Sequence, residues 1–122
     1  MRPAEVRFYF DADVLGLAKV LASLRSDVTY PGDRGAVVRK RVRPPCPIET
    51  TDVDDEFWIP IVAEKGWAII TRDRSIQRKP AEIQAVRDTG AKMFALTSPE
   101  QLSVWDQLEI VMSRWRDIER LA

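Results

Sequence analysis

At two places in the sequence, acidic side chains directly follow an apolar run. Asp11 and Asp13 follow Phe8–Phe10, and Asp73 follows Trp67–Ile70 after two polar residues. Such runs are typical of buried strands, and the carboxyl ends of parallel strands line one shared cleft. Carboxylates that meet in a cleft repel one another unless a cation lies between them. Because Mg²⁺ and Mn²⁺ prefer oxygen ligands and assist phosphoryl displacement, these acids predict a metal-dependent hydrolytic site.

A third acidic group, Asp54 to Glu56, directly precedes an apolar segment that begins at Phe57. Acids are favoured in the first turn of a helix, so this group predicts a helix start. The same explanation applies at the first strand, where Asp13 is expected to cap a helix and Asp11 to occupy a turn if no metal binds. Each group is therefore open to a purely structural interpretation.

The composition excludes several kinds of catalytic site. The chain has 122 residues, 45% of them hydrophobic, with one cysteine (Cys46) and no histidine. Without histidine, a Ser-His-Asp triad and a Cys/His zinc site are both excluded. A single cysteine fits reduced, cytoplasmic surroundings, and no apolar run approaches the roughly 20 residues of a membrane span. We therefore expect a cytoplasmic protein without a membrane segment.

Basic residues are concentrated in one segment although the overall charge is zero, with 19 basic and 19 acidic residues. The segment from about residue 32 to residue 50 also contains glycines and prolines, so it predicts a long loop. Its cations are expected either to be solvated or to contact RNA phosphates near the acidic cleft. The residues proposed for RNA contact are Arg39, Lys40, Arg41 and Arg43.

The periodicity of the apolar residues predicts alternating strands and helices. Strands are expected near residues 8–10, 27–30, 67–70 and 93–96, and helices near 14–24, 54–65, 81–89 and 99–120, the last one capped by Ser98. Pro60 is expected either to kink the second helix or to delay its regular part to Ile59. The prediction is a single-domain α/β protein, a three-layer α/β/α sandwich. Its mostly parallel sheet has four strands, or five if Ala36–Val38 also joins it.

Three segments of the chain resemble the PIN domain, in its PIN-like branch related to VapC-type toxins. These segments are Phe8–Asp11, Asp55–Ala63 and Gly66–Asp73, and the resemblance covers about residues 6 to 98. It implies a metal-dependent endoribonuclease, typically the toxin of a bacterial type II toxin-antitoxin pair. An antitoxin protein is then an expected partner. The last helix is long for so small a domain, so its apolar face is expected either to form a homodimer or to pack entirely inside the monomer.

The resemblance also implies roles for individual residues. Asp11, Asp55 and Asp73 match the family's metal-binding acids, and Thr71 matches its hydroxyl residue beside the third strand. Where the family often carries a further acid, this chain has Ser75. Asp13, or Asp106 on the last helix, is a candidate substitute, and one Mg²⁺ or Mn²⁺ ion is the simpler expectation.

Other classes of protein share parts of this pattern. Asp-x-Asp after a first strand also occurs in haloacid-dehalogenase-type phosphatases, but these need Thr or Val in place of Leu15 and a later lysine followed by an acidic loop. Phosphoacceptor receiver domains have carboxylates after their first and third strands, but the lysine that they carry after the last strand is missing here. Ser75 favours a third alternative, a catalytically inactive PIN-like module that binds RNA or a partner protein.

Overall fold

The computed structural model describes residues 1–72, 80–96 and 102–122 of the chain. Within these ranges the strands are β1 (Arg2–Pro3), β2 (Phe8–Phe10), β3 (Val28–Thr29), β4 (Ala36–Val38), β5 (Arg41–Arg43), β6 (Ala68–Arg72) and β7 (Met93–Leu96). The helices are the short 3₁₀ turn η1 (Ala12–Val14), α1 (Leu15–Leu24), α2 (Asp55–Glu64), α3 (Pro80–Thr89) and α4 (Val104–Leu121). In the described part of the chain, no helix is both long enough and apolar enough to cross a membrane.

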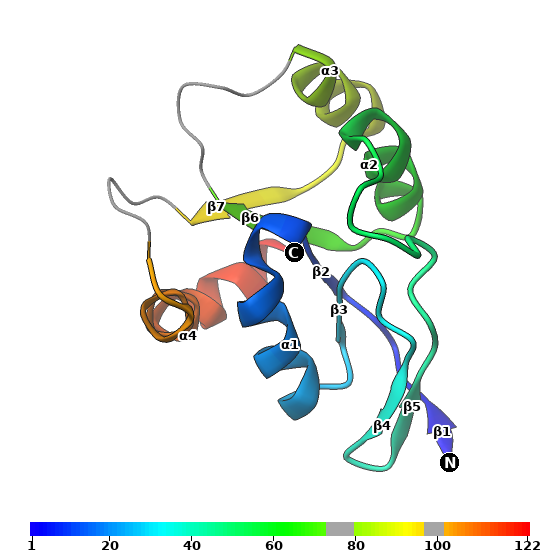
Figure 1. The fold of residues 1–122 in the computed structure, drawn as a ribbon, viewed down its shortest axis with the longest axis vertical. Coiled ribbons are helices and arrows are strands. Elements are labelled where there is room, and N and C mark those ends of the chain that lie inside the picture. The colour runs from blue at the N-terminus through cyan, green and yellow to red at the C-terminus, as the bar shows by residue number, and fades with distance from the viewer. Residues whose placement is uncertain (73–79, 97–101) are drawn as a thin grey trace.

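The central sheet has the order β3-β2-β6-β7, and all of its neighbouring strands are parallel. Side chains alternate between the two faces of a strand, so Phe8 and Phe10 enter one apolar cluster and Tyr9 enters the other. Helices α1 and α4 cover the first face, and α2 and α3 cover the second (Figure 1). The predicted three-layer α/β/α arrangement with a four-stranded parallel sheet is confirmed.

The predicted basic loop instead contains a second, small sheet. Strands β4 and β5 form an antiparallel hairpin, and β1 pairs with β5 in parallel, giving the order β1-β5-β4. Ala36–Val38 is therefore a strand, but it does not join the central sheet. The hairpin projects from the end of the molecule where β1 begins (Figure 1).

One helix with an internal proline matches its predicted range, and the last helix begins later than predicted. Helix α2 runs without interruption from Asp55 through Pro60, which is exposed. Proline cannot donate to the carbonyl of Glu56, and that residue is also exposed, so water can satisfy the carbonyl. Helix α4 begins at Val104, later than predicted, because the Ser103 hydroxyl accepts from the Asp106 amide and caps it. Ser98–Gln101, the predicted cap, lies outside the described residues.

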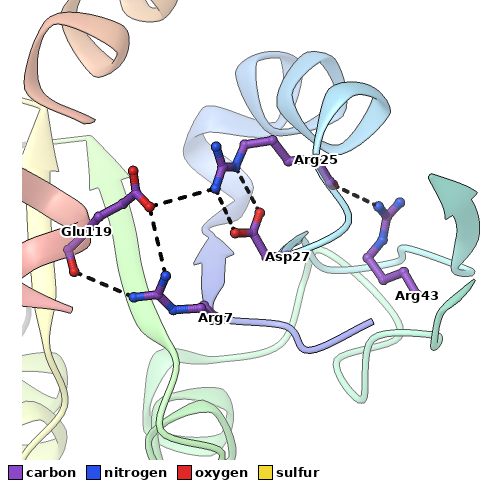
Figure 2. Close-up of polar contacts among 5 residues, drawn as sticks. All are labelled: Arg7, Arg25, Asp27, Arg43 and Glu119. Atoms are coloured by element: carbon purple, nitrogen blue, oxygen red, sulfur yellow. Dashed lines mark hydrogen bonds and ion pairs between the residues drawn. The ribbon is translucent and has the colours of Figure 1, made fainter. Parts of the chain in front are cut away.

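Arg43 anchors the hairpin to the rest of the protein. Its guanidinium is 2.7 Å from the Asp33 carboxylate, and both side chains are almost fully buried. Asp33 also accepts from the Thr29 hydroxyl and from the Gly35 amide. In addition, Arg43 donates to the carbonyls of Ala22 and Arg25 at the end of α1, the second of which is drawn in Figure 2. Arg43 is therefore a structural residue, and its predicted contact with RNA is wrong.

Candidate active site

Two acids and one hydroxyl meet where β2 and β6 end. The Thr71 hydroxyl lies 2.9 Å from Asp13 Oδ2 and 3.4 Å from Asp11 Oδ2, and it donates to these carboxylate oxygens. The Arg72 amide also donates to Asp13 Oδ2, over 3.2 Å. Thr71 is buried, whereas both acids are partly exposed. The carboxylates are therefore held from the protein side, and one oxygen of Asp13, Oδ1, is itself buried.

The register of the central sheet explains why these residues meet. Phe10, the last residue of β2, pairs with Ile70 of β6. Asp11, which directly follows β2, therefore lies beside Thr71, which follows Ile70 in β6. The Asp11 amide donates to the Ile70 carbonyl over 2.9 Å, which continues the strand pairing by one residue. The chain then turns into η1, and this turn returns Asp13 toward β6.

The structural interpretation holds for Asp11, which starts the 3₁₀ turn, but not for Asp13, which does not cap α1. The Asp11 carboxylate accepts from the Ala12 amide and caps η1. Helix α1 has no side-chain cap, since its N-cap residue is Val14, and the Asp13 carboxylate instead reaches across to β6. Capping therefore accounts for one oxygen of Asp11, but not for the hydrogen bonds that Asp13 accepts from β6.

Asp55 is placed by the start of α2 and by a buried tryptophan. The Trp58 indole N–H donates to Asp55 Oδ1 over 2.9 Å, and the Trp58 ring packs on Tyr9 with ring centroids 5.0 Å apart. Burial raises the pKa of the Tyr9 phenol far above its usual range, and nearby negative charges, those of Asp11, Cys46, Asp55 and Asp13, add to this effect. Asp55 and Asp11 thus share Tyr9 as a neighbour, and the phenol stays protonated.

The donor atoms present fit a hard divalent cation only in part. Asp11, Asp13 and Asp55 supply carboxylate oxygens, the ligand type that Mg²⁺ and Mn²⁺ prefer. Within the described ranges, however, no three acidic, histidine or cysteine side chains are arranged closely enough to hold one ion. Asp73 and Ser75 lie outside these ranges. Mg²⁺ commonly needs only one or two carboxylates and keeps its waters, so the Asp11 and Asp13 pair satisfies the minimum requirement.

The exposed cations of the hairpin lie far from these acids. Arg39 and Arg41 line a cavity together with Leu24, the last residue of α1, and its C-cap Arg25, whereas Asp11 and Asp13 precede the start of α1. Ten helical residues correspond to about 15 Å. These cations therefore lie toward the opposite end of α1 from the acids, and their contact with RNA stays a prediction.

Two features near the acids were not predicted from the sequence. The first is the Trp58–Asp55 hydrogen bond, which the i to i+3 spacing on a helix permits. The second is a cavity of about 460 Å³ that extends from Leu15 to Thr51 and includes the exposed cations Lys19 and Arg34. Its position, between the start of α1 and the segment before α2, depends on tertiary packing and has no local sequence signal.

Sequence comparison agrees with the fold. A family model described as "PIN like domain" matches residues 6–98, so the chain belongs to the PIN-like domain family. A curated Mycobacterium tuberculosis protein named "Putative ribonuclease VapC45" is 34% identical over 55 residues. That match covers 45% of this chain and 40% of the relative, so the chain is aligned with less than half of the relative's length. No solved structure matches.

Proposed function

We propose that this protein is a divalent-metal-dependent endoribonuclease that hydrolyses RNA phosphodiester bonds. One observation carries the proposal: the carboxylates of Asp11 and Asp13 converge on the Thr71 hydroxyl at the carboxyl ends of two parallel strands. Membership of the PIN-like family and the similarity to a protein named as a ribonuclease support the same chemistry.

The proposed metal ligands are Asp11, Asp55 and Asp73, with Asp13 in support. A bound Mg²⁺ or Mn²⁺ supplies an activated water and stabilises the charge that develops on the phosphate oxygens. Thr71 orients the site, because its single hydroxyl proton is directed at the two carboxylates. Trp58 restrains Asp55, because its N–H fixes one of the two carboxylate oxygens.

The proposed partners follow from the same similarity. An antitoxin protein would cover the site or its RNA path, as expected for the toxin of a type II pair. Homodimer formation is proposed through α4, where Trp105 is 68% exposed and Met112 is 65% exposed. By contrast, Trp115 packs on Phe8 with ring centroids 4.7 Å apart, so it belongs to the monomer core. A cytoplasmic location is proposed because the one cysteine, Cys46, is free and buried.

The alternative function is an inactive PIN-like module that binds RNA or a protein. Ser75, in the position of a family acid, is the observation that favours it. The two functions are distinguished by incubating the purified protein with single-stranded RNA in Mg²⁺, in Mn²⁺ and in EDTA. The nuclease proposal predicts cleavage that needs the metal and stops in EDTA. RNA binding with the same low background of cleavage in all three conditions would instead support the binding module.

Replacing Trp58 by Phe tests how Asp55 is held. The ring is retained for packing on Tyr9, but the indole N–H is lost, so the Asp55 carboxylate can rotate. We expect the metal dissociation constant to rise about 10- to 100-fold, as is typical when a group that orients a ligand is removed. Isothermal titration calorimetry with Mn²⁺ measures this change.

Trp115→Phe is the matched control for Trp58→Phe. Trp115 is also packed in the interior, but its indole nitrogen is buried without a hydrogen-bond partner in the described part of the chain. This variant should bind the metal as the wild type does. Equal metal affinity in the wild type and in Trp58→Phe would show that the hydrogen bond does not position Asp55.

A further inference from the structure

A second charged cavity lies at the end of the sheet opposite the acids. Its volume is about 270 Å³, and it lies between the end of α1, the segment before β2 and the hairpin. Four arginines and two acids are among its lining residues, which are Glu5, Arg7, Arg25, Asp27, Arg39 and Arg41, together with Leu24 and Ser26. The formal charge of this lining is therefore positive.

Two of the four arginines are already paired with acids. Arg25 contacts Asp27 through two hydrogen bonds of 2.8 Å and 2.9 Å, and Figure 2 shows the pair together with Glu119. Arg7 approaches Glu119 to 3.9 Å, and its guanidinium lies over the Phe8 ring. Arg39 and Arg41, which are both exposed, have no ion pair in the described part of the chain. The excess positive charge thus belongs to the hairpin.

The hairpin turn places two cations in a costly backbone conformation. Arg39 and Lys40 have φ angles of 51° and 64°, in the left-handed region that long side chains rarely adopt. Tight two-residue turns with two positive φ angles strongly favour Asn-Gly, so Arg-Lys at these positions destabilises the turn. Strain of this kind often accompanies a functional site.

Strand pairing adds a second unfavourable contact between like charges. Arg41 is the direct partner of Arg2 in the parallel pairing of β5 with β1. Directly paired like charges destabilise a sheet. A bound anion at this edge would reduce the repulsion between Arg41 and Arg2, and it would also be attracted by the cations of the turn.

We propose that Arg39, Lys40 and Arg41 form a phosphate-binding site for the backbone of single-stranded RNA, remote from the acids. This inference rests on the proposed function for its choice of RNA as the ligand. The length of α1, about 15 Å, separates the two ends of the sheet, so only an RNA of several nucleotides contacts both. The site therefore holds a distant part of a long substrate.

The Arg39→Asn/Lys40→Gly variant tests this site, because it should stabilise the turn while removing two charges. Binding of fluorescein-labelled RNAs of about 4 and about 16 nucleotides is measured by anisotropy at several salt concentrations in EDTA, which keeps the RNA intact. For the longer RNA we expect about tenfold weaker binding and a salt slope smaller by about 1.4, at about 0.7 for each lost phosphate contact. The gain in affinity from the shorter to the longer RNA should be smaller than in the wild type. The Tm of the variant should rise by a few degrees, since its turn is less strained.

Arg114→Gln/Arg116→Gln is the matched control, since it removes two exposed positive charges from α4. Equal losses of RNA affinity in both double variants would show that only the net charge of the protein matters, and would overturn the proposal. Unchanged binding of the longer RNA by the hairpin variant would also overturn it, and would assign the cations to a protein partner. Because no cleavage is needed, absence of nuclease activity in the wild type would refute the proposed function and leave this measurement valid.

Discussion

Replacing Asp11 by Asn should lower the rate of RNA cleavage at least about 10³-fold, which corresponds to about 4 kcal/mol in the activation barrier. The substitution removes the negative charge that is proposed to bind the metal. It keeps an oxygen that can accept from the Ala12 amide, and Asn is as good an N-cap as Asp, so η1 should stay intact. Initial rates on one labelled RNA, at saturating Mg²⁺ or Mn²⁺, measure the loss.

Asp117→Asn provides the control for charge removal at a distant position. Asp117 lies on α4 and is exposed, and it forms an exposed ion pair with Arg120 over 3.4 Å. This variant should cleave RNA at the wild-type rate. If Asp11→Asn were to retain more than about a tenth of the wild-type rate, a loss below 1.4 kcal/mol, Asp11 could not be an essential metal ligand.

Replacing Arg43 by Met should destabilise the protein by about 3–5 kcal/mol, because it leaves the buried carboxylate of Asp33 without its counter-charge. In the described part of the chain, the Asp33 carboxylate would keep two neutral hydrogen-bond donors, the Thr29 hydroxyl and the Gly35 amide. The carbonyls of Ala22 and Arg25 would also lose a donor at the end of α1. Urea denaturation followed by circular dichroism measures the free energy of unfolding.

Arg41→Met is the matched control, in the same strand and of the same residue type. Its side chain is exposed and forms no ion pair in the described part of the chain, so we expect a change within about 0.5 kcal/mol. Adding Asp33→Asn to Arg43→Met should recover part of the lost stability, because no unpaired buried charge then remains. Equal stabilities for Arg43→Met and Arg41→Met would contradict the structural role of the buried pair.

The central sheet could be predicted from the sequence because its strands carry a strong local signal. Phe8–Phe10 and Ala68–Ile70 are continuous apolar segments, as expected for strands that are covered on both faces. The helices predicted near residues 54–65 and 81–89 are each followed by a glycine, Gly66 and Gly90, and both glycines adopt the positive φ angles typical of helix ends. Local patterns of this kind do not depend on distant partners.

The hairpin could not be predicted, because its usual signals are missing. An Asn-Gly turn would have indicated two paired strands, but the turn residues are Arg39 and Lys40. Arg43 was misassigned for a related reason. A run of basic residues does not show which member will find a buried acid, and Asp33 is ten positions away in the chain.

Part of the candidate site could be predicted from topology alone. The positions of Asp11, Asp13 and Thr71 follow from two parallel strands that end side by side. That Asp13 crosses to β6 and does not cap α1 depends on the 3₁₀ turn, which has no clear sequence signature. The assignment of Asp73 stays a prediction, since this residue lies outside the described ranges.

Calorimetric titration of Mn²⁺ into the wild type and into Asp11→Asn, Asp55→Asn and Asp73→Asn tests the central claim most directly. A metal held jointly by the three acids predicts measurable binding to the wild type and a large loss of affinity in each variant. Asp117→Asn should bind as the wild type does. No binding to the wild type at millimolar Mn²⁺, or unchanged affinity in all three variants, would contradict a metal-dependent active site at the ends of β2 and β6.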